Sequence, residues 1–383
     1  MIYLDNAATS GFKPKGVEAA LLYDLAHSAN SGRSGHRYAL DAAVKIENCR
    51  EYLLSALGAD GGGYAAVFTK NCTEALNLGI FGFLREGMRV VTTAFDHNSV
   101  LRPLFELEKR GKISLMVVEP AGGRITPEHL DSALANADFA ALSIASNVTG
   151  ARIDLDLLAE SVRRSGVTLL LDGAQAVPLV PVDMKKLGAH MLALPGHKGL
   201  HGVQGTGVLV FRRDLGLMPL LMGGTGTASD STYQPSEPPE AFEAGTLFAG
   251  GIAALHAGAK WSFENAAALR EHTARLGGEL AGYLKAMGAE LYTRDTSLGV
   301  ISFNLPGRDS GEIADKLAEA DIAVRGGLHC APLAHRALGT QNRGAVRASI
   351  GADTTERDIY TFAARLEAIS ARLRRSDALN RTR

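Results

Sequence analysis

Short apolar runs alternate with amphipathic stretches from about residue 60 to residue 212, and this alternation constrains the fold more than any other feature of the chain. Runs this continuous are typical of strands that are buried on both faces of a largely parallel sheet. Seven of them occur, at residues 65–68, 90–93, 115–118, 140–144, 168–171, 191–194 and 208–211. Helix signals lie between the runs, among them the N-cap and first-turn proline of Thr126-Pro127. The pattern predicts an α/β fold built on a large, doubly wound, mostly parallel sheet.

The pattern changes after about residue 250. An alanine-rich helical stretch runs from Gly251 to about Ala286, and strand-like segments at 299–304 and 345–350 flank a helix at 312–319. A final helix is expected to begin at the capping-box signature Asp353-Thr354-Thr355-Glu356 and to run to about Arg374. These elements are typical of a smaller α+β domain. The 383 residues therefore suit a large domain over 14–250 and a small one formed by 1–13 and 251–383.

Charge and composition argue against several classes of function. The 40 basic and 41 acidic residues nearly cancel and leave a formal net charge of −1, which offers no footprint for nucleic acid or a membrane surface. No apolar stretch approaches the roughly 18 residues that a membrane span needs, and the N-terminus does not resemble a signal peptide. Three cysteines at unrelated spacings argue against a disulfide framework and for a reducing cytoplasm. We expect a cytoplasmic protein with no nucleic-acid, membrane or metal partner.

Polar and reactive side chains follow five of the seven expected strands. In open α/β sheets, ligands bind beyond the carboxyl ends of the strands. The segments at these ends are Thr69-Lys70-Asn71-Cys72-Thr73-Glu74, Asp96-His97-Asn98, Ser146-Asn147, Asp172-Gly173-Ala174-Gln175 and Pro195-Gly196-His197-Lys198. Packing alone does not explain five such ends, so we expect them to contribute to a functional site.

Lys198 and Asp172 point to a particular cofactor. Taken singly, each has an ordinary explanation, because a lysine in a glycine-rich loop is usually solvated and an aspartate after a strand often caps a turn. Pyridoxal 5'-phosphate (PLP), however, needs a lysine for its Schiff base, an anion that keeps its pyridine nitrogen protonated, and a cradle for its phosphate. Lys198 and Asp172 supply the first two at successive strand ends, and the turn before Thr73 offers a helix N-terminus for the phosphate. This combination favours a PLP-dependent enzyme.

Two motifs make the chain recognisable. Leu171-Asp172-Gly173-Ala174-Gln175 is followed about 20 residues later by Gly196-His197-Lys198, and Arg325-Gly326-Gly327-Leu328-His329-Cys330-Ala331 stands near the C-terminus. With these motifs the chain resembles the class V aminotransferase family of PLP fold type I, and within it the cysteine desulfurases. The likeness runs from Tyr3-Leu4-Asp5-Asn6 to Arg347-Ala348-Ser349, nearly the whole chain.

The resemblance implies a role for each candidate residue of the cofactor site. Lys198 would form the Schiff base and carry protons, and Asp172 would pair with the pyridine nitrogen. The remaining cofactor-binding candidates are Gln175 and Asn147 around the phenolic oxygen, His97 on the ring face, and Cys72, Thr73 and His197 by the phosphate. Thr246, in Phe242-Glu243-Ala244-Gly245-Thr246, matches a threonine that reaches the phosphate of a neighbouring subunit, which implies a homodimer.

Cys330 indicates which reaction the cofactor would serve. By the same resemblance, its thiolate would take sulfur from L-cysteine as a persulfide and leave L-alanine, which requires an accessible thiol on a loop. Gly326 and Gly327 favour such a loop, and Arg325 would assist as a positive neighbour. Arg347 would bind the substrate α-carboxylate, for which a planar guanidinium is suited. The alternative is a buried, inert thiol, which is what we expect for Cys49 in a helical stretch.

The sequence departs from the best-known desulfurases at three positions. Leu328 and Pro195 stand where one branch has a histidine and a serine, and Phe248 stands where an asparagine is usual. These departures leave a selenocysteine lyase, a cyst(e)ine C–S lyase or another class V enzyme with a dispensable Cys330 as alternatives. The substrate would be a small amino acid, cysteine or selenocysteine, and a sulfur-acceptor protein is a possible partner. A nucleotide-binding protein is disfavoured, because neither a G-x-x-x-x-G-K-[ST] run nor a suitably placed G-x-G-x-x-G turn occurs.

Overall fold

The computed structural model describes residues 1–31, 34–227 and 229–381, and the chain divides into two compact units. The larger unit comprises Lys13–Ala145 and Ile153–Ala266. The smaller unit comprises Met1–Phe12, Ser146–Arg152 and Ala267–Arg383. Compared with the domains expected from the sequence, this division assigns residue 13 and residues 251–266 to the larger unit and 146–152 to the smaller one. The expected domain bounds themselves stay a prediction.

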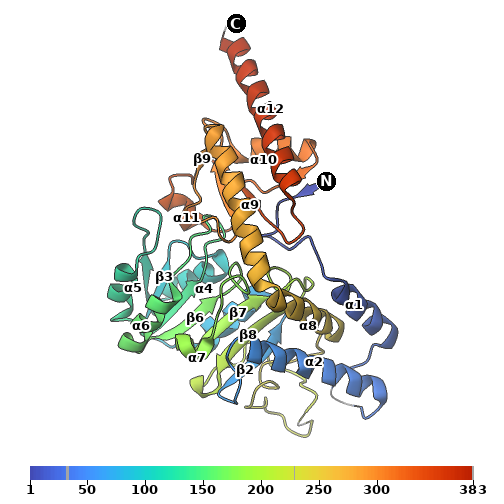
Figure 1. Cartoon of the computed structure of the whole chain (residues 1–383). Helices are drawn as coiled ribbons and strands as arrows, with labels where there is room; N and C mark the ends of the chain where they lie inside the picture. Colours follow the sequence, from blue (N-terminus) through green and yellow to red (C-terminus); the bar gives the residue numbers. More distant parts are fainter. Residues whose placement is uncertain (32–33, 228, 382–383) are drawn as a thin grey trace. The chain divides into compact units, whose positions relative to one another are not determined.

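Seven strands form the sheet of the larger unit (Figure 1). They are β2 (Tyr64–Thr69), β3 (Met88–Thr93), β4 (Ile113–Val118), β5 (Phe139–Ser143), β6 (Thr168–Asp172), β7 (Met191–Pro195) and β8 (Gly207–Arg212), in the order β2-β8-β7-β6-β5-β3-β4. Each overlaps one of the seven apolar runs, so that prediction is confirmed. Strand β8 runs antiparallel to both of its neighbours, and the other pairings are parallel. The mostly parallel sheet expected from the sequence is therefore present.

The strands are apolar because helices cover the sheet. Residues of β5 and β6 such as Phe139 and Leu170 are fully buried, and they share one cluster with Leu76 and Ile80 of α3. Helix α8 packs against both α1 and α2 (Figure 1). The helices of this unit are α1 (Lys15–His27), α2 (Arg37–Ala56), α3 (Cys72–Phe83), α4 (Asn98–Lys109), α5 (Pro127–Leu134), α6 (Leu155–Ser165), α7 (Met184–Leu187) and α8 (Ala249–Glu264), with one 3-10 turn, η1 (Arg213–Leu215).

The strand directions decide where the reactive residues gather. Strands β2 and β7 are both antiparallel to β8, so they run the same way as each other and as β3, β5 and β6. Their carboxyl ends therefore lie on one edge of the sheet, which we call the functional edge. The start of β8, at Gly207, lies on this same edge.

The smaller unit has two small sheets. A three-stranded sheet has the order β12-β10-β9, and β1 pairs with β11 in parallel. Its elements are β1 (Ile2–Tyr3), α9 (Ala266–Ala286, whose first residue lies in the larger unit), β9 (Glu290–Leu291), β10 (Val300–Asn304), α10 (Ser310–Glu319), β11 (Ile322–Ala323), α11 (Pro332–Ala337), β12 (Val346–Ser349) and α12 (Glu356–Arg381). An apolar cluster that includes Leu276, Phe303 and Phe362 forms its core. This is the α+β architecture expected for the C-terminal part.

Two local expectations for the C-terminal half are corrected. The helical stretch 251–286 consists of two helices, because α8 ends at Glu264 and is capped by Asn265, whose side chain donates to the carbonyl oxygen of Trp261 at 2.8 Å. The capping box of the last helix joins Thr355 and Asp358, two positions beyond the expected signature. The Thr355 N–H donates to the Asp358 carboxylate at 2.8 Å, and the Asp358 N–H donates to the Thr355 hydroxyl at 3.2 Å.

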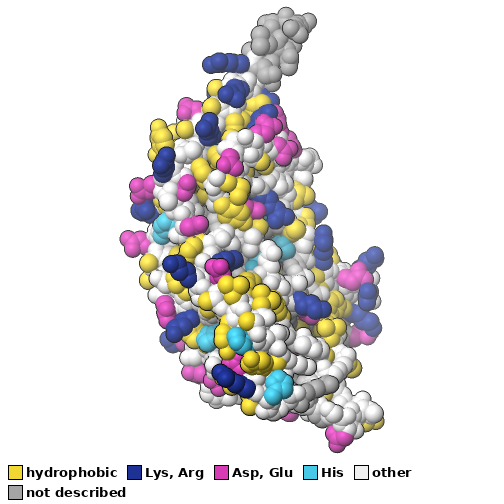
Figure 2. Space-filling view, turned by 90° about the vertical axis from the view of Figure 1, so that its right-hand side faces the viewer, with side chains coloured by type: hydrophobic (Ala, Val, Ile, Leu, Met, Phe, Trp, Pro, Cys, Tyr) yellow, Lys and Arg dark blue, Asp and Glu magenta, His cyan; other side chains and the backbone are white. Residues whose placement is uncertain are grey.

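The surface carries both signs of charge. On the face seen in Figure 2, lysine and arginine side chains are interspersed with aspartate and glutamate. Among the described residues, no helix is both long enough and apolar enough to cross a bilayer.

Candidate active site

Asp172 and Lys198 occupy neighbouring positions on the functional edge. Asp172 is the last residue of β6 and pairs with Ala193 of β7, and the chain leaves β7 at Pro195 and reaches Lys198 three residues later. Asp172 is buried, and burial raises the pKa of its carboxyl group, whereas the charge of Lys198 lowers that pKa. The two side chains that the sequence paired are therefore within electrostatic reach of each other.

The turn that carries Lys198 is closed at its base. The Gly196 N–H donates to the carbonyl oxygen of Thr206 at 2.9 Å, and the Gly202 N–H donates to the carbonyl oxygen of Gly196 at 2.8 Å. Glycine is required at position 196, because a Cβ atom there would lie 2.1 Å from the Thr206 hydroxyl oxygen. Lys198 itself is half-buried. The lysine thus extends from a fixed turn that both starts and ends on the functional edge.

Cys72 contacts Asp172. Its Sγ donates to Asp172 Oδ1 across 3.8 Å, and the same oxygen accepts the N–H of Ala174 at 2.9 Å. Burial is the main cause that raises the pKa of the Cys72 thiol well above its usual value, so the thiol is a neutral donor. The sequence predicted Cys72 beside the phosphate, and that role remains untested. The described contact of the thiol is with the carboxylate instead.

The N-terminus of α3 offers an anion site. Asn71 caps the helix, with its side-chain oxygen accepting the Glu74 N–H at 2.9 Å, and Cys72 and Thr73 form the first turn. First-turn N–H groups have no partner inside a helix and attract anions. Strand β8 approaches closely here, because a Cβ atom at Gly207 would lie 2.4 Å from the carbonyl carbon of Asn71. The α3 N-terminus is therefore the candidate place for a phosphate.

His97 lies at the N-terminus of the next helix, α4. Its Nδ1 accepts the Ser99 N–H at 3.0 Å and lies 2.8 Å from Ser99 Oγ. Ser99 Oγ is also 2.9 Å from Thr73 Oγ1, so one serine joins the two candidates. The preceding Asp96 is fully buried and accepts from the hydroxyl groups of Thr92 and Thr93, both at 2.8 Å, which fixes the turn that presents His97.

His197 and Lys13 lie together beside the Lys198 turn. The Lys13 amine donates to the carbonyl oxygen of His197 at 3.2 Å. Burial lowers the pKa of Lys13 to about 8, and burial followed by the charges of Lys198 and Lys13 lowers the pKa of His197 to about 4. His197 is therefore a neutral hydrogen-bonding group at neutral pH. No local sequence signal indicated Lys13, because it contacts the site across 184 residues of chain.

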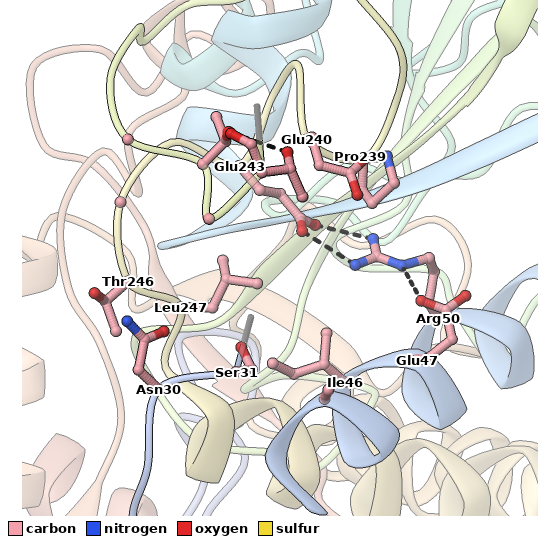
Figure 3. A pocket seen from close by; sticks show the side chains of 16 residues that line it. Asn30, Ser31, Ile46, Glu47, Arg50, Pro239, Glu240, Glu243, Thr246 and Leu247 are labelled. Carbon is pink, nitrogen blue, oxygen red and sulfur yellow. Dashed lines mark hydrogen bonds and ion pairs between the residues drawn. The ribbon is translucent and has the colours of Figure 1, made fainter. Parts of the chain in front are cut away.

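Thr246 lies on an exposed segment that a buried ion pair anchors. Arg50 of α2 donates to both carboxylate oxygens of Glu243, at 2.9 and 3.0 Å, and Glu243 also accepts the Phe68 N–H at 2.7 Å. Figure 3 shows this pair and Thr246 lining one pocket of about 430 Å³. Gln175, the remaining cofactor candidate of this unit, is half-buried in the turn after β6.

The smaller unit holds the candidate substrate residues. Arg347 is 2% exposed, and its guanidinium donates to the carbonyl oxygen of Asn147 and to the carboxylate of Asp5, both at 3.1 Å. Arg325 pairs with Arg347 through their backbones. Within the part of the chain that the structure describes, Arg347 Nε and Asn147 Oδ1 are buried without a hydrogen-bond partner. Buried polar groups are normally hydrogen-bonded, so these two atoms are exceptions at the candidate substrate residues.

Cys330 is exposed, unlike Cys49, which is fully buried in α2 with its thiol pKa raised by that burial. The expectation of an accessible thiol at position 330 and a structural one at position 49 agrees with these exposures. Cys330 and His329 both have left-handed backbones, with φ values of 57° and 49°. His329 holds this conformation, because its Nε2–H donates to the Ala345 carbonyl oxygen at 2.9 Å and its own carbonyl accepts from Asn147 at 2.7 Å.

The residues present fit PLP. The buried carboxylate of Asp172, the lysine after the next strand and the helix N-terminus at Thr73 are the three groups that this cofactor needs. Among the described residues, no group of three or more histidine, cysteine, aspartate or glutamate side chains could hold a metal ion.

Comparisons with known proteins give one consistent result. The family model described as aminotransferase class-V matches residues 2–362. A probable cysteine desulfurase of Pyrococcus abyssi is 33% identical over 98% of this chain and 96% of its own length. A second, from Methanothermobacter thermautotrophicus, is 33% identical over 96% of this chain and 94% of its own length.

Solved structures agree with the sequence relatives. The apo structure of a cysteine desulfurase from Thermococcus onnurineus NA1 is similar with a TM-score of 0.88 and 32% identity, covering 96% of this chain and 94% of that chain. A cysteine desulfurase from Escherichia coli is similar with a TM-score of 0.84 and 26% identity, over the same shares of both chains. The fold expected from the sequence, PLP fold type I, is therefore confirmed.

Proposed function

Because the chain belongs to the class V aminotransferase family, we propose that it is a PLP-dependent cysteine desulfurase, which converts L-cysteine to L-alanine and carries the sulfur as a persulfide on Cys330. The chain is similar to proteins named cysteine desulfurase over nearly its whole length and nearly the whole length of each relative, and this similarity supports the reaction. The observation that carries the proposal is the exposed thiol of Cys330, in a chain whose Asp172 and Lys198 are arranged for PLP.

The protein's own residues have distinct tasks in this proposal. When bound, PLP supplies an electron sink that weakens bonds at the carbon atoms of the substrate. Lys198 would bind the cofactor and move protons at the substrate Cα, Asp172 would keep a positive charge on the pyridine nitrogen, and the α3 N-terminus at Thr73 would hold the phosphate. His97 would cover the ring. Gln175 and Asn147 would bond to its phenolic oxygen, and Cys72, His197 and Thr246 would complete the set of cofactor-binding residues.

Cys330 determines the products. Its thiolate attacks the substrate sulfur, the bond between Cβ and sulfur breaks, and the electron pair of that bond is protonated at Cβ. One thiol and one cysteine thus become one persulfide and one alanine, with every atom accounted for. Arg347 binds the substrate carboxylate and Arg325 supports it. The left-handed backbone at His329 and Cys330 presents the sulfur on an exposed loop.

One observation favours a second candidate. Leu328, two residues before Cys330, is 41% exposed and places an apolar side chain where one branch of desulfurases has a histidine. Without a proton-transfer group at this position, the chain could cleave cystine or cysteine by β-elimination, or act on selenocysteine, and Cys330 would then be dispensable.

A homodimer is part of the proposal. Leu22 and Leu25 of α1 and Leu40 and Val44 of α2 are each more than half exposed, which suits a surface that a second copy covers. The reducing cytoplasm is the proposed compartment, because a persulfide carrier must return to the thiol state. A sulfur-acceptor protein would take the persulfide sulfur.

Replacement of Cys330 by alanine tests the reaction. We expect Cys330→Ala to bind PLP and turn yellow like the wild type, but to lose nearly all formation of alanine from cysteine under limiting reductant. Cys49→Ala removes a thiol that lies outside the site and serves as the matched control, with alanine formation retained.

Product analysis separates the two candidates. Unchanged turnover by Cys330→Ala, with pyruvate and ammonia as products, would favour the eliminating lyase. Parallel assays with cysteine, cystine and selenocysteine identify the preferred substrate. A protein that stays colourless after reconstitution with PLP would contradict both candidates.

A further inference from the structure

Ser99 joins two residues that the proposed function uses for different purposes. It lies in the first turn of α4 and is 9% exposed. Its Oγ is 2.8 Å from Nδ1 of His97, the residue that covers the cofactor ring, and 2.9 Å from Oγ1 of Thr73, the residue at the phosphate. The three groups form one chain across the N-termini of α3 and α4.

The backbone decides the direction of the first hydrogen bond. The Ser99 N–H donates to His97 Nδ1 at 3.0 Å, and an N–H group can only donate. Nδ1 is therefore the acceptor nitrogen of His97, and the ring proton sits on Nε2. Because Nδ1 carries no proton, the Ser99 hydroxyl, at 2.8 Å, can bond to it only as a donor.

The direction of the second hydrogen bond then depends on the phosphate. While the Ser99 hydroxyl donates to His97, its oxygen accepts the Thr73 hydroxyl proton at 2.9 Å. A phosphate dianion at the α3 N-terminus accepts protons only, so Thr73 would turn its proton toward the anion. The Thr73 oxygen then becomes an acceptor for the same Ser99 proton that His97 receives.

We propose that Ser99 is a positioning residue whose hydroxyl orients the His97 ring, the proton of which the backbone already keeps on Nε2, and couples this histidine to the phosphate site at Thr73. The inference rests on the proposed function, because it takes His97 and Thr73 as cofactor-binding residues. Ser99 need not touch the cofactor. It shares its hydroxyl proton between the group over the ring and the group at the phosphate, so occupancy of one alters the hydrogen bonding of the other.

The first test measures the cofactor without turnover. We expect Ser99→Ala to bind PLP about 5- to 10-fold more weakly, the scale of one hydrogen bond, and to change the visible circular dichroism of the bound cofactor because the ring over its face is less fixed. In a Thr73→Val background, the same substitution should cause little further loss of affinity. Ser165→Ala, which removes a hydroxyl that bonds within α6, is the matched control and should leave both properties unchanged.

The second test measures coupling to His97 in the holoenzyme. If Ser99 acts through this ring, Ser99→Ala should lower kcat of the wild type by about 10-fold and have almost no effect in a His97→Ala background. Such non-additivity is the signature of groups that act together. A general loss of folding would instead give additive losses in both backgrounds.

The outcomes distinguish the inference from the proposed function. Wild-type protein that binds no PLP contradicts the proposed function. Wild-type protein that binds PLP and turns over, while Ser99→Ala matches it in PLP affinity, circular dichroism and kcat, contradicts the role of Ser99 alone. Additive effects with both His97→Ala and Thr73→Val also contradict it. If Ser99→Ala does not fold, Ser99→Cys keeps the size of the side chain, lacks a strong donor, and permits the same comparisons.

Discussion

Asp172 shows how one residue acquires its role from its surroundings. Burial raises the pKa of its carboxyl group, and two donors, Cys72 Sγ and the Ala174 N–H, counteract that effect together with the charge of Lys198. A buried carboxylate stabilises a neighbouring cation strongly, since little water screens the charges. The same burial keeps the Cys72 thiol protonated, so it donates to Asp172 and does not compete as an anion.

Asp172→Asn tests this role. The amide has nearly the same shape but no charge, so we expect PLP to bind through Lys198 while kcat falls by at least about 100-fold, the scale on which one electrostatic group acts in an active site. Absorbance of the bound cofactor and single-turnover rates measure the two effects separately. Asp156→Asn, an exposed change on α6, should leave both unaffected. Wild-type kcat in Asp172→Asn would mean that the pyridine nitrogen needs no anion from β6.

The three residues that differ from the best-known desulfurases, Pro195, Phe248 and Leu328, lie in different structural environments. Pro195 is the buried last residue of β7, and Phe248 is about half exposed where α8 begins. Gly251 must be glycine while Phe248 is there, because a Cβ atom at 251 would lie 2.2 Å from the Phe248 ring. Leu328 remains the departure with a consequence for chemistry, since it lies on the Cys330 loop, two residues before the cysteine.

Among the elements, α2 and β2 are tied to the segment of Thr246 by the Arg50–Glu243 pair. Arg50 also donates to Glu47 at 3.0 Å and lies over the ring of Phe68. Glu243 has a raised pKa because it is buried, although Arg50 lowers it. A buried pair of this kind adds little over an apolar pair of equal volume, but each partner depends on the other.

Breaking one side of this pair should destabilise the larger unit. We expect Glu243→Gln to lower the free energy of unfolding by about 3–5 kcal/mol, because the Arg50 charge stays buried without its partner. Addition of Arg50→Met should restore most of the loss. Urea unfolding followed by circular dichroism measures both variants, with Glu86→Gln at the exposed pair with Lys112 as a control that should match the wild type. A double variant as unstable as Glu243→Gln would contradict the explanation.

The elements differ in how well the sequence predicted them. All seven strands of the large sheet were predicted, because strands buried on both faces carry continuous apolar runs that few other structures require. The break at Asn265 was missed, since alanine-rich sequence continues across it and the side-chain bond to Trp261 has no periodic signal. The last capping box was placed two residues too early because Asp353 and Thr355 are both capable caps, and only the backbone selects Thr355.

For the whole molecule, topology made part of the site predictable. Parallel strands bring their carboxyl ends to one edge, so residues that follow those strands, such as Asp172 and Lys198, could be grouped from sequence alone. Ser99, Asp96 and Lys13 could not be assigned their contacts in this way. Those contacts depend on rotamers and on bonds between distant segments, and the residue types alone, serine, aspartate and lysine, are too common to signal them.

Three buried histidines and the half-buried His197 should make stability depend on pH. Burial lowers the pKa of His197, His201 and His335 to about 4 and that of His329 to about 3. Unfolded histidines titrate near 6.5, so between about pH 6.5 and pH 4 the unfolded chain binds more protons. The free energy of unfolding should therefore fall as pH falls through this window.

Urea unfolding at a series of pH values, from about 7.5 to about 5, measures how the free energy of unfolding depends on pH. The raised pKa values of Asp96, Asp172 and Glu243 act in the opposite direction, so the comparison is made between variants. His201→Gln should weaken the dependence, because it removes one buried ring, whereas His129→Gln at an exposed position should not. An unchanged dependence in His201→Gln would contradict this origin of the acid sensitivity.

The reversed strand β8 has a consequence for the conformational entropy of the lysine. Parallel neighbours are joined by crossings that return through a helix, but the segment from Gly196 to Thr206 leaves the functional edge and re-enters the sheet on the same side. A short closed loop has few alternative conformations. The backbone of Lys198 therefore loses its conformational entropy when the chain folds. Little further entropy has to be lost there when the cofactor binds.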